Sequence, residues 1–450
     1  MGLKNLIFGG QKALENTELA AFYSGRLQSW LDICNGGGDW RYTRKGGLNG
    51  GTRRVASLGA AKALCAELAR LCFSEGTEFI CSDRDSDKYL QAVLEENNFT
   101  ENFSEFLEKV FALGGGAVKI YRDQSTKLDF VPADRFIPTK WDANGIYGGA
   151  FGSPVFRDGR NYILAETQEL TPEGLFTENR LFRENGREEV LSDIFPDLLP
   201  RSIIYGMDKP LFVYFRAAPA EGNLPLGSSV FSRAEDTLKA LDIVFDSLMR
   251  EFILGKKRII VPSYAVRGDY DENGDIKRYF DVNDEVFEAF STSDSEELKI
   301  SDTTSQLRVS EHIGAIDKLL ELLCMQAGLS EGTLSFKSGT IRTATEVISR
   351  NSRTYRTACM YRRIIAEGLK RLFGNILSLG KMAGELSPAA SEAVEIRFAD
   401  GICEDENAKA ERAQKLFASG LISRTRAVSE IYGISREQAK AMVKEDTDGE

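Results

Sequence analysis

Histidine is almost absent from this chain of 450 residues, which holds a single one, at position 312. General acid–base catalysis uses histidine more often than any other side chain, and many serine and cysteine nucleophiles depend on one. His312 stands in an expected helix with Ile313 and Ile316 beside it, a setting typical of an ordinary structural residue. We therefore expect no catalytic residue in this protein.

Long apolar runs and paired cysteines are also missing. No stretch of about 18 apolar residues occurs, so we expect no segment that crosses a membrane. Residues 1–8 hold one lysine and only a short apolar run, without the features of a secretory signal peptide. The seven cysteines form no CxxC pair, and their odd number and scattered positions predict reduced, buried thiols in a cytosolic protein.

Signatures of nucleotide and metal binding are incomplete. The glycines at 114–116 follow an expected helix and precede an expected strand, the reverse of the order that dinucleotide-binding proteins need. No phosphate-binding GxxxxGK[ST] motif occurs. Residues 269–274 fit the start of an EF-hand calcium loop, but Phe280 stands where the bidentate glutamate is required. Runs of Asp, Asn and Gly are usually turns, so we expect no metal and no cofactor.

Charge is distributed unevenly along the chain. The net charge of −11 argues against a protein that coats nucleic acid over its whole surface. Residues 268–302 hold twelve acidic and three basic residues, a net charge of −9. Residues 342–371 hold eight basic and two acidic residues, a net charge of +6. The basic stretch is a solvated helix face, an inter-subunit ion-pair surface or a phosphate-binding stripe, and the two opposite charges favour assembly through complementary patches.

Hydrophobic periodicity and turn residues predict both helices and short strands. Helices are expected over residues 17–34, 53–73, 86–97, 101–113, 229–254, 309–327, 343–380, 404–419, 423–432 and 435–444. Strands are expected over residues 77–81, 117–121, 128–131, 136–138, 147–151, 162–166, 181–184, 211–215, 276–280, 286–290 and 394–398. Ser228 or Ser229 is the expected cap of the helix over 229–254, and Gly255 is its expected stop. The pattern predicts an α+β protein.

The order of several segments resembles the portal proteins of long-tailed double-stranded DNA phages. A strand run at 113–121 (LGGGAVKIY) is followed by VPADRFIP at 131–138. LGSSVF at 226–231 and LDIVFD at 241–246 look like the start of the family's first stem helix. GTIRTATEV at 339–347 looks like the run into its long wing helix. These motifs are structural rather than catalytic, and their order and spacing together carry the resemblance.

The resemblance implies a portal fold with a mixed α/β wing, a two-helix stem, a small α/β clip, a long wing helix and a short helical crown. The expected boundaries in this chain are residues 1–228 and 343–385 for the wing, 229–255 and 307–328 for the two stem helices, 256–306 for the clip, 329–342 for the channel loop and 386–450 for the crown.

The resemblance also implies a structural function and no enzymatic activity. Portal subunits form a ring, typically a dodecamer, at one capsid vertex, and double-stranded DNA is packaged and ejected through its channel. The expected partners are other copies of this chain, the passing DNA, the large terminase, the head–tail adaptor, and capsid and scaffolding proteins, with no membrane. The expected location is the virion, with the host cytoplasm during assembly.

Three groups of site residues follow from this mapping. The channel loop would contact DNA weakly and without sequence preference through Ser335, Lys337, Ser338, Thr340 and Arg342. The clip would dock the motor and the adaptor through Asp269, Asp271, Glu272, Asp275, Asp284 and Glu285. Neighbouring subunits would meet at Arg350, Arg353, Arg356, Arg362 and Arg363.

Two other functions remain as alternatives at this stage. One is a metal-dependent enzyme acting on nucleic acid, with the carboxylates of residues 269–285, above all Asp271 and Asp275, holding a divalent ion. The other is a different virion assembly protein that forms no DNA channel. Metal-dependent cleavage distinguishes the first alternative, and a ring without a central hole distinguishes the second.

Overall fold

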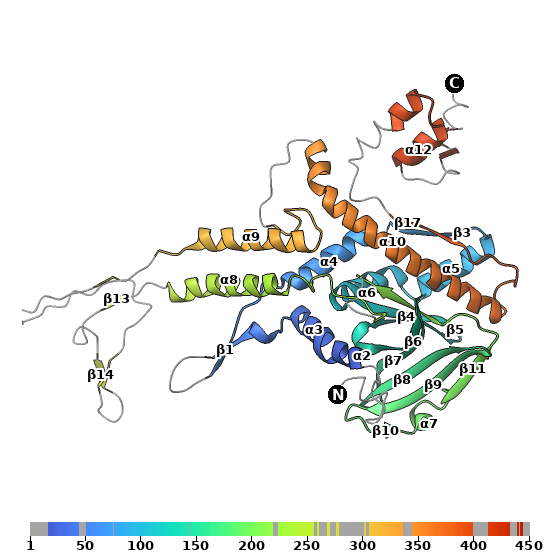
Figure 1. Ribbon diagram of the computed structural model, residues 1–450, viewed down its shortest axis with the longest axis horizontal. Coiled ribbons are helices and arrows are strands. Elements are labelled where there is room, and N and C mark those ends of the chain that lie inside the picture. Colours follow the sequence, from blue (N-terminus) through green and yellow to red (C-terminus); the bar gives the residue numbers. More distant parts are fainter. Residues whose placement is uncertain are drawn as a thin grey trace, which may run out of the picture. The chain divides into compact units, whose positions relative to one another are not determined.

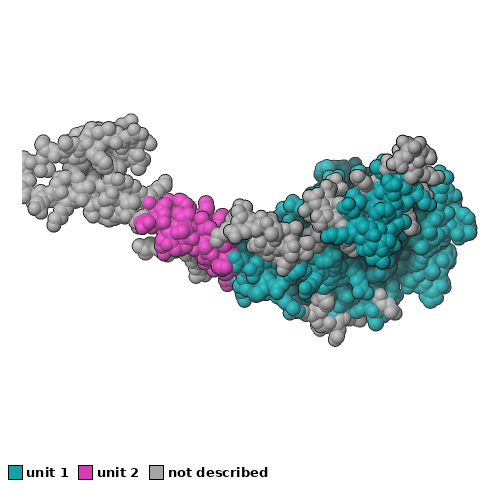
Figure 2. Space-filling view, turned by 90° about the horizontal axis from the view of Figure 1, so that it is seen from above, with its two compact units in different colours: residues 1–39, 59–238, 320–450 teal, residues 40–58, 239–319 magenta. Residues whose placement is uncertain are grey.

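The computed structural model divides into two units, which are described separately (Figure 2). Unit 1 comprises residues 1–39, 59–238 and 320–450, and unit 2 comprises residues 40–58 and 239–319. The structure describes residues 17–44, 51–74, 76–143, 145–218, 224–255, 259–260, 268–270, 276–278, 301–302, 306–335, 344–398, 413–432, 439–440 and 442–443.

The first helical stretch of unit 1 contains a π-helical turn. In place of the single α-helix predicted over residues 17–34, three segments follow one another: α2 (Thr17–Ala21), the π-helical η1 (Phe22–Leu27) and α3 (Gln28–Cys34). Phe22 and Leu27 are both buried and lie five residues apart, which is one π turn. The wider turn therefore keeps both side chains on the buried face.

Three α-helices follow in unit 1: α4 (Ala60–Cys72), α5 (Arg84–Glu96) and α6 (Phe99–Leu113). α5 and α6 confirm the predicted helices over 86–97 and 101–113, and each begins two residues before its predicted start. The helix predicted over 53–73 is wrong at its start, because residues 52–54 form a strand that pairs with residues 42–44. Gly59, with φ of +71°, has the left-handed conformation that ends the extended segment before α4.

The two larger sheets of unit 1 are both antiparallel (Figure 1). The smaller sheet has the order β12-β4-β5, and the larger has the order β10-β9-β8-β7-β6, with β11 also paired to β9. The predicted strands between residues 117 and 215 are confirmed, and β10 and β11 are additional. The strands are β4 (Gly115–Asp123), β5 (Ser125–Pro132), β6 (Phe136–Asp142), β7 (Gly145–Arg157), β8 (Arg160–Thr171), β9 (Gly174–Arg183), β10 (Glu188–Glu189), β11 (Arg201–Tyr205) and β12 (Phe212–Arg216).

An aromatic cluster forms the centre of the unit 1 core. Its rings come from β3 (Glu78–Cys81), α6, β5, β12 and the long helix α10 (Ala344–Met382). Neighbouring ring centroids lie 4.9 to 6.5 Å apart, a range in which edge-to-face and offset pairs are favourable. The members are Phe79, Phe99, Phe103, Phe106, Phe130, Phe215 and Phe373. The cluster joins residues almost 300 positions apart (79 and 373) in one core.

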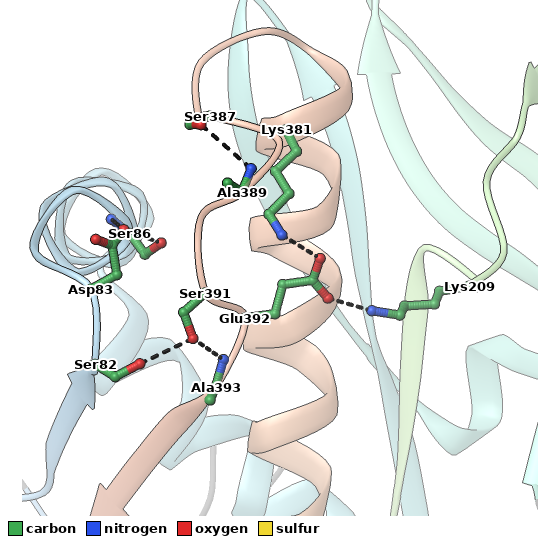
Figure 3. Close-up of polar contacts among 10 residues, drawn as sticks. All are labelled: Ser82, Asp83, Ser86, Lys209, Lys381, Ser387, Ala389, Ser391, Glu392 and Ala393. Carbon is green, nitrogen blue, oxygen red and sulfur yellow. Dashed lines mark hydrogen bonds and ion pairs between the residues drawn. The ribbon is translucent and has the colours of Figure 1, made fainter.

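The segment after α10 returns to the amino-terminal part of unit 1. Strand β17 (Val394–Arg397) confirms the predicted strand over 394–398 and pairs with β3. Just before it, the Glu392 carboxylate accepts hydrogen bonds from Lys209 at 2.6 Å and Lys381 at 2.9 Å (Figure 3). Ser82 donates to Ser391 at 3.0 Å in the same region. α10, which confirms the helix predicted over 343–380, packs against α4, α5, β12 and β17.

Two further long helices are α8 (Glu235–Leu254) and α9 (Val309–Gln326). α9 confirms the helix predicted over 309–327. α8 begins six residues later than predicted, because Ser232 and Ala234 donate backbone hydrogen bonds to carbonyls three residues before them and form turns. The serines at 228 and 229 are therefore not its cap.

The segment between these helices and the carboxyl terminus are described only in part. Short strands are β13 (Ile259–Ile260), paired with β16 (Ser301–Asp302), and β14 (Gly268–Tyr270), paired with β15 (Ile276–Arg278). β15 confirms the first part of the strand predicted over 276–280, and residues 286–290 lie outside the described residues. Near the carboxyl terminus, α12 (Arg424–Tyr432) confirms the helix predicted over 423–432.

Candidate functional site

Helices α8 and α9 form an antiparallel pair. In unit 2, the Arg308 guanidinium and the Glu251 carboxylate form an ion pair at 3.1 Å. In unit 1, Thr237 donates a hydrogen bond to Gln326 at 2.9 Å. The start of α8 thus lies beside the end of α9, so the segment 255–308 leaves and returns at the same end of the pair.

His312, the single histidine, is part of this helix pair. Its Nδ1 lies 2.6 Å from the Arg308 carbonyl oxygen, which can only accept, so Nδ1 carries the proton. In the neutral ring, Nε2 then accepts from the Ser247 hydroxyl at 3.1 Å. Both ring nitrogens are therefore occupied by contacts within and between the two helices, which is the structural role predicted from the sequence.

Two aspartates on α8 hold the hairpin segment, which we define as residues 40–58 of unit 2. Asp242, 4% exposed, accepts hydrogen bonds from the Trp40 indole at 2.9 Å and from the Leu58 backbone amide at 3.0 Å. The Arg41 guanidinium lies 3.1 Å from the same carboxylate. Burial lowers the pKa of Arg41, and the negative charge of Asp242 opposes that effect.

Asp246, one turn further along α8, holds the second half of the hairpin segment. Both of its oxygens accept from the Arg53 guanidinium at 2.7 Å, and one also accepts from the Ala56 amide at 2.9 Å. Such bidentate pairs are among the stronger protein hydrogen bonds. The hydrogen bonds from Arg53 lower the pKa of the Asp246 carboxyl and outweigh the opposing effect of burial.

Analysis of the sequence missed this contact between the hairpin segment and α8. The available signal was the spacing of Asp242 and Asp246, which lie four residues apart and so share a face of a helix whose neighbouring positions are apolar. Buried carboxylates need paired donors, and the spacing alone does not identify where those donors come from.

The loop after α9 is fixed at its base to α10. Ser330 and Thr354 exchange hydrogen bonds in both directions, from the Ser330 amide to the Thr354 hydroxyl at 2.8 Å and from the Thr354 amide to the Ser330 hydroxyl at 3.2 Å. Thr357 donates to the Gly328 carbonyl at 2.6 Å. Of the predicted channel-loop residues, Ser335 is half-buried, and Lys337, Ser338, Thr340 and Arg342 lie outside the described residues.

The predicted inter-subunit arginines of α10 differ in exposure. Arg353, Arg356 and Arg363 are exposed. Arg362 is half-buried and is engaged within unit 1, where it donates to the Leu71 carbonyl at 3.0 Å and lies over the Phe398 ring, 5.7 Å from its centroid. Arg350 lies in α10, and its side chain is outside the described part of the structure.

The predicted clip residues are almost entirely outside the described part of the chain. Asp269 lies in β14, whereas Asp271, Glu272, Asp275, Asp284 and Glu285 are not described. Across the described ranges, no group of three or more His, Cys, Asp or Glu side chains is arranged to hold a metal ion. Within the same ranges, no helix is both long enough and apolar enough to span a membrane.

Comparison with models of known protein families finds a match to this chain. A model of the family described as phage portal protein, SPP1 Gp6-like, matches residues 49–146 and 210–450. The unmatched interval between the two ranges contains most of β7 and the strands β8 to β11. None of the curated proteins matches the chain.

Solved structures of low sequence identity also align with the chain. One is a chain in the virion of a native gene transfer agent particle, at 14% identity and a TM-score of 0.38, with 84% of this chain and 89% of that chain covered. Another is a chain from the neck of such a particle, computed with C12 symmetry, at 12% identity and a TM-score of 0.40. The alignment covers 83% of this chain and 88% of that chain.

Proposed function

The chain belongs to the SPP1 Gp6-like family of phage portal proteins, and on that premise we propose how its parts form a channel for double-stranded DNA. It is a phage portal subunit, and the single observation that carries this conclusion is the family match over most of the chain. The role is structural, and no catalytic step is part of the proposal.

We assign α8 and α9 to the stem and residues 256–306 to the clip. The antiparallel contacts from Thr237–Gln326 to Glu251–Arg308 support this assignment, because they bring both ends of the clip segment to one end of the helix pair. The clip is the part that would dock the large terminase and later the head–tail adaptor. Its acidic residues are the proposed docking groups.

Residues 329–342 are the proposed channel loop. Its base is held to α10 through Ser330 and Thr354, so a displacement of the loop would be transmitted directly to the long wing helix. The remainder of α10 and residues 1–228 form the proposed wing, and residues 386–450 form the crown. Ser335, Lys337, Ser338, Thr340 and Arg342 are the proposed contacts to passing DNA.

A ring of identical subunits, with twelve as the expected number, accounts for two surface features. Exposed apolar side chains on α8 and α9, among them Ile243, Ile253 and Met325, need a partner surface to leave water. The exposed α10 arginines, Arg353 and Arg356, would complement an acidic surface of another copy. In a ring, one face of each subunit meets a different face of the next. A neighbouring copy could therefore cover these apolar side chains and pair with these arginines.

The proposed location is one vertex of the capsid in the virion. Capsid and scaffolding proteins would contact the ring there, and assembly would take place in the host cytoplasm. This location places the channel between the DNA-filled head and the adaptor.

Negative-stain electron microscopy of the purified chain, with and without the scaffolding or capsid protein, tests the proposal. We expect rings with a central hole. The double variant Arg353→Glu/Arg356→Glu should abolish rings, whereas the control Lys88→Glu, at an exposed position of α5, should form them normally. Solid particles without a hole, or monomers under every assembly condition, would overturn the proposed channel.

A further inference from the structure

Strand β11 (Arg201–Tyr205) lies at one edge of the larger sheet of unit 1. It pairs with β9, and Figure 1 shows it at the margin of that sheet. The Asn179 amide donates to the Pro200 carbonyl at 2.8 Å, and the Gly206 amide donates to the Glu173 carbonyl at 3.1 Å. Hydrogen-bonded pairs alternate along an antiparallel ladder. The even-numbered residues of β11 therefore direct their amides and carbonyls at β9, and the odd-numbered residues direct theirs away from the sheet.

The outer edge of β11 is open. The odd-numbered residues are Arg201, Ile203 and Tyr205, and within the described ranges no backbone hydrogen bond reaches their amides or carbonyls. The Arg201 side chain is 71% exposed, and Tyr205 is 70% exposed. An exposed row of backbone donors and acceptors is a template for a further strand.

The features that usually protect such an edge do not protect this one. Proline blocks an edge when it removes an outward-facing amide. Pro200 precedes β11 at a position that faces β9, so it removes no outward-facing donor. The charge of Arg201 is already paired with Glu178 of β9 at 2.8 Å. The pairing of β11 with β9 is also continuous, without a bulge. The outer edge can therefore accept another strand.

Two copies of β11 complement each other. In an antiparallel pair centred on Ile203, the two Ile203 side chains face each other, and each Arg201 lies opposite Tyr205 of the other copy. A guanidinium beside an aromatic ring and two facing apolar side chains are both favourable pairs. The two Arg201 side chains start about 14 Å apart along the strands. Salt screens charges at that separation, because the Debye length is about 8 Å at physiological ionic strength.

We propose that a second copy of this chain binds at the outer edge of β11, through antiparallel pairing of the two strands about Ile203. The outward-facing amides of each copy then meet the outward-facing carbonyls of the other, and the two larger sheets continue into one another. A contact of two five-residue strands is smaller than a standard interface, so the dimer forms reversibly and depends on concentration.

This contact is additional to the ring of the proposed function. It is two-fold, with the same strand on both sides, whereas neighbours in a ring meet through two different faces. It therefore joins chains that are not neighbours in one ring. β11 also lies in the interval 147–209, which the family model does not match. The contact thus rests on this chain's own sheet edge and not on the family.

Sedimentation velocity of the purified full-length chain at increasing concentration tests for the dimer, because it separates dimers from monomers and from rings by mass. Tyr205→Arg places an arginine opposite Arg201 of the other copy and should raise the dissociation constant of the dimer by about tenfold. The exchange Arg201→Tyr/Tyr205→Arg restores the pair and should recover the dimer. The control Phe156→Arg replaces an aromatic side chain of similar exposure, 71%, on β7, which lies between β6 and β8, and should leave the dimer unchanged.

Cysteine variants test the register of the two strands. In Ile203→Cys the two new thiols lie directly opposite each other, with Cα atoms about 5.5 Å apart, a separation that a disulfide spans. In Tyr205→Cys the two new thiols start about 14 Å apart. After mild oxidation with diamide, Ile203→Cys should give a covalent dimer on a non-reducing gel, and Tyr205→Cys should give no more dimer than the wild type.

Three results would each overturn the proposal: monomers without dimers at every concentration, a dimer that Tyr205→Arg leaves unchanged, or equal cross-linking of the two cysteine variants. The outcome is separate from that of the proposed function. Rings in the electron microscope together with any of these three results would remove only the β11 contact. Register-specific dimers in a chain that never forms rings would remove only the channel.

Discussion

Removal of the Asp246 side chain should make the whole hairpin segment open from α8 more often. In Asp246→Ala, Arg53 loses both of its carboxylate contacts and the Ala56 amide loses its acceptor. The backbone amides of Val55 and Leu58 keep their acceptors in this variant, because they donate to the Arg41 carbonyl and to the Asp242 carboxylate. Faster opening at Val55 and Leu58 would therefore report on the segment as a unit.

The expected loss follows from the geometry of this contact. Hydrogen bonds to a charged group contribute about 1.5–3 kcal/mol each. The Arg53 side chain is 30% exposed, so water replaces part of what it loses. Alanine also favours the helix over aspartate by up to about 0.7 kcal/mol. We expect a net loss of about 2 kcal/mol in the free energy of local opening, or about 30-fold faster exchange.

Hydrogen exchange measured by mass spectrometry on peptides covering residues 51–58 checks this value. Asp236→Ala is the matched control, because Asp236 is exposed in the first turn of the same helix. Its exchange in residues 51–58 should equal that of the wild type. Unchanged exchange at Val55 and Leu58 in Asp246→Ala would refute the reasoning that the carboxylate holds the segment as one unit.

Low pH should have the same effect as Asp246→Ala. The hydrogen bonds from Arg53 lower the folded-state pKa of Asp246 below its unfolded value of about 3.9. The stabilisation is therefore complete above the unfolded pKa and is lost as the pH falls through the folded pKa. Exchange of residues 51–58, corrected for its intrinsic pH dependence, should accelerate in the wild type at low pH and stay flat in Asp246→Ala.

Three further predictions concern contacts in unit 1, and the first has a control variant in unit 2. Gly227→Ala places a methyl group against the Gly114 carbonyl and should lower the free energy of unfolding by about 3 kcal/mol, measured by urea titration. In the control Gly314→Ala, the methyl group enters open space on α9 and should raise the free energy of unfolding by up to about 1 kcal/mol. Glu392→Ala leaves two lysines without their carboxylate and should cost about 1 kcal/mol, measured by thermal unfolding at low and high salt. Thr354→Val should accelerate amide exchange at Ser330 by about tenfold without unfolding α10. Wild-type behaviour in any of the destabilising variants would contradict the corresponding contact.

Much of the helical structure follows from local pattern. The helices over 309–327 and 343–380 are predicted almost to the residue, because each carries its own apolar stripe and its own end signals. The strand at 394–398 and the strands between 117 and 215 are also predicted from alternation and turn residues. The errors lie where a partner elsewhere in the chain decides the conformation, as at residues 52–54, which pair with residues 42–44.

The contacts of the candidate site were harder to predict from the sequence than the helices and strands. The resemblance implies that α8 and α9 form one stem, and the basic stretch of α10 is visible in the sequence as charge. The contacts of Arg362 with Leu71 and Phe398 cannot be predicted from the sequence, since the neighbouring Arg363 has the same charge and is exposed. One position of difference along a helix rotates a side chain by about 100°, and only packing determines which arginine faces the protein.

The sequence by itself determined that this protein has a mixed α and β fold, a single histidine and a strong separation of charge along the chain. These are properties of composition and local periodicity. The tertiary structure decided which groups pair with the carboxylates of α8: Asp242 and Asp246 both bind the hairpin segment. The physical reason is that a carboxylate shows in the sequence only that it needs a hydrogen-bond donor when it is buried. Which group meets that need depends on how segments far apart in the chain pack together.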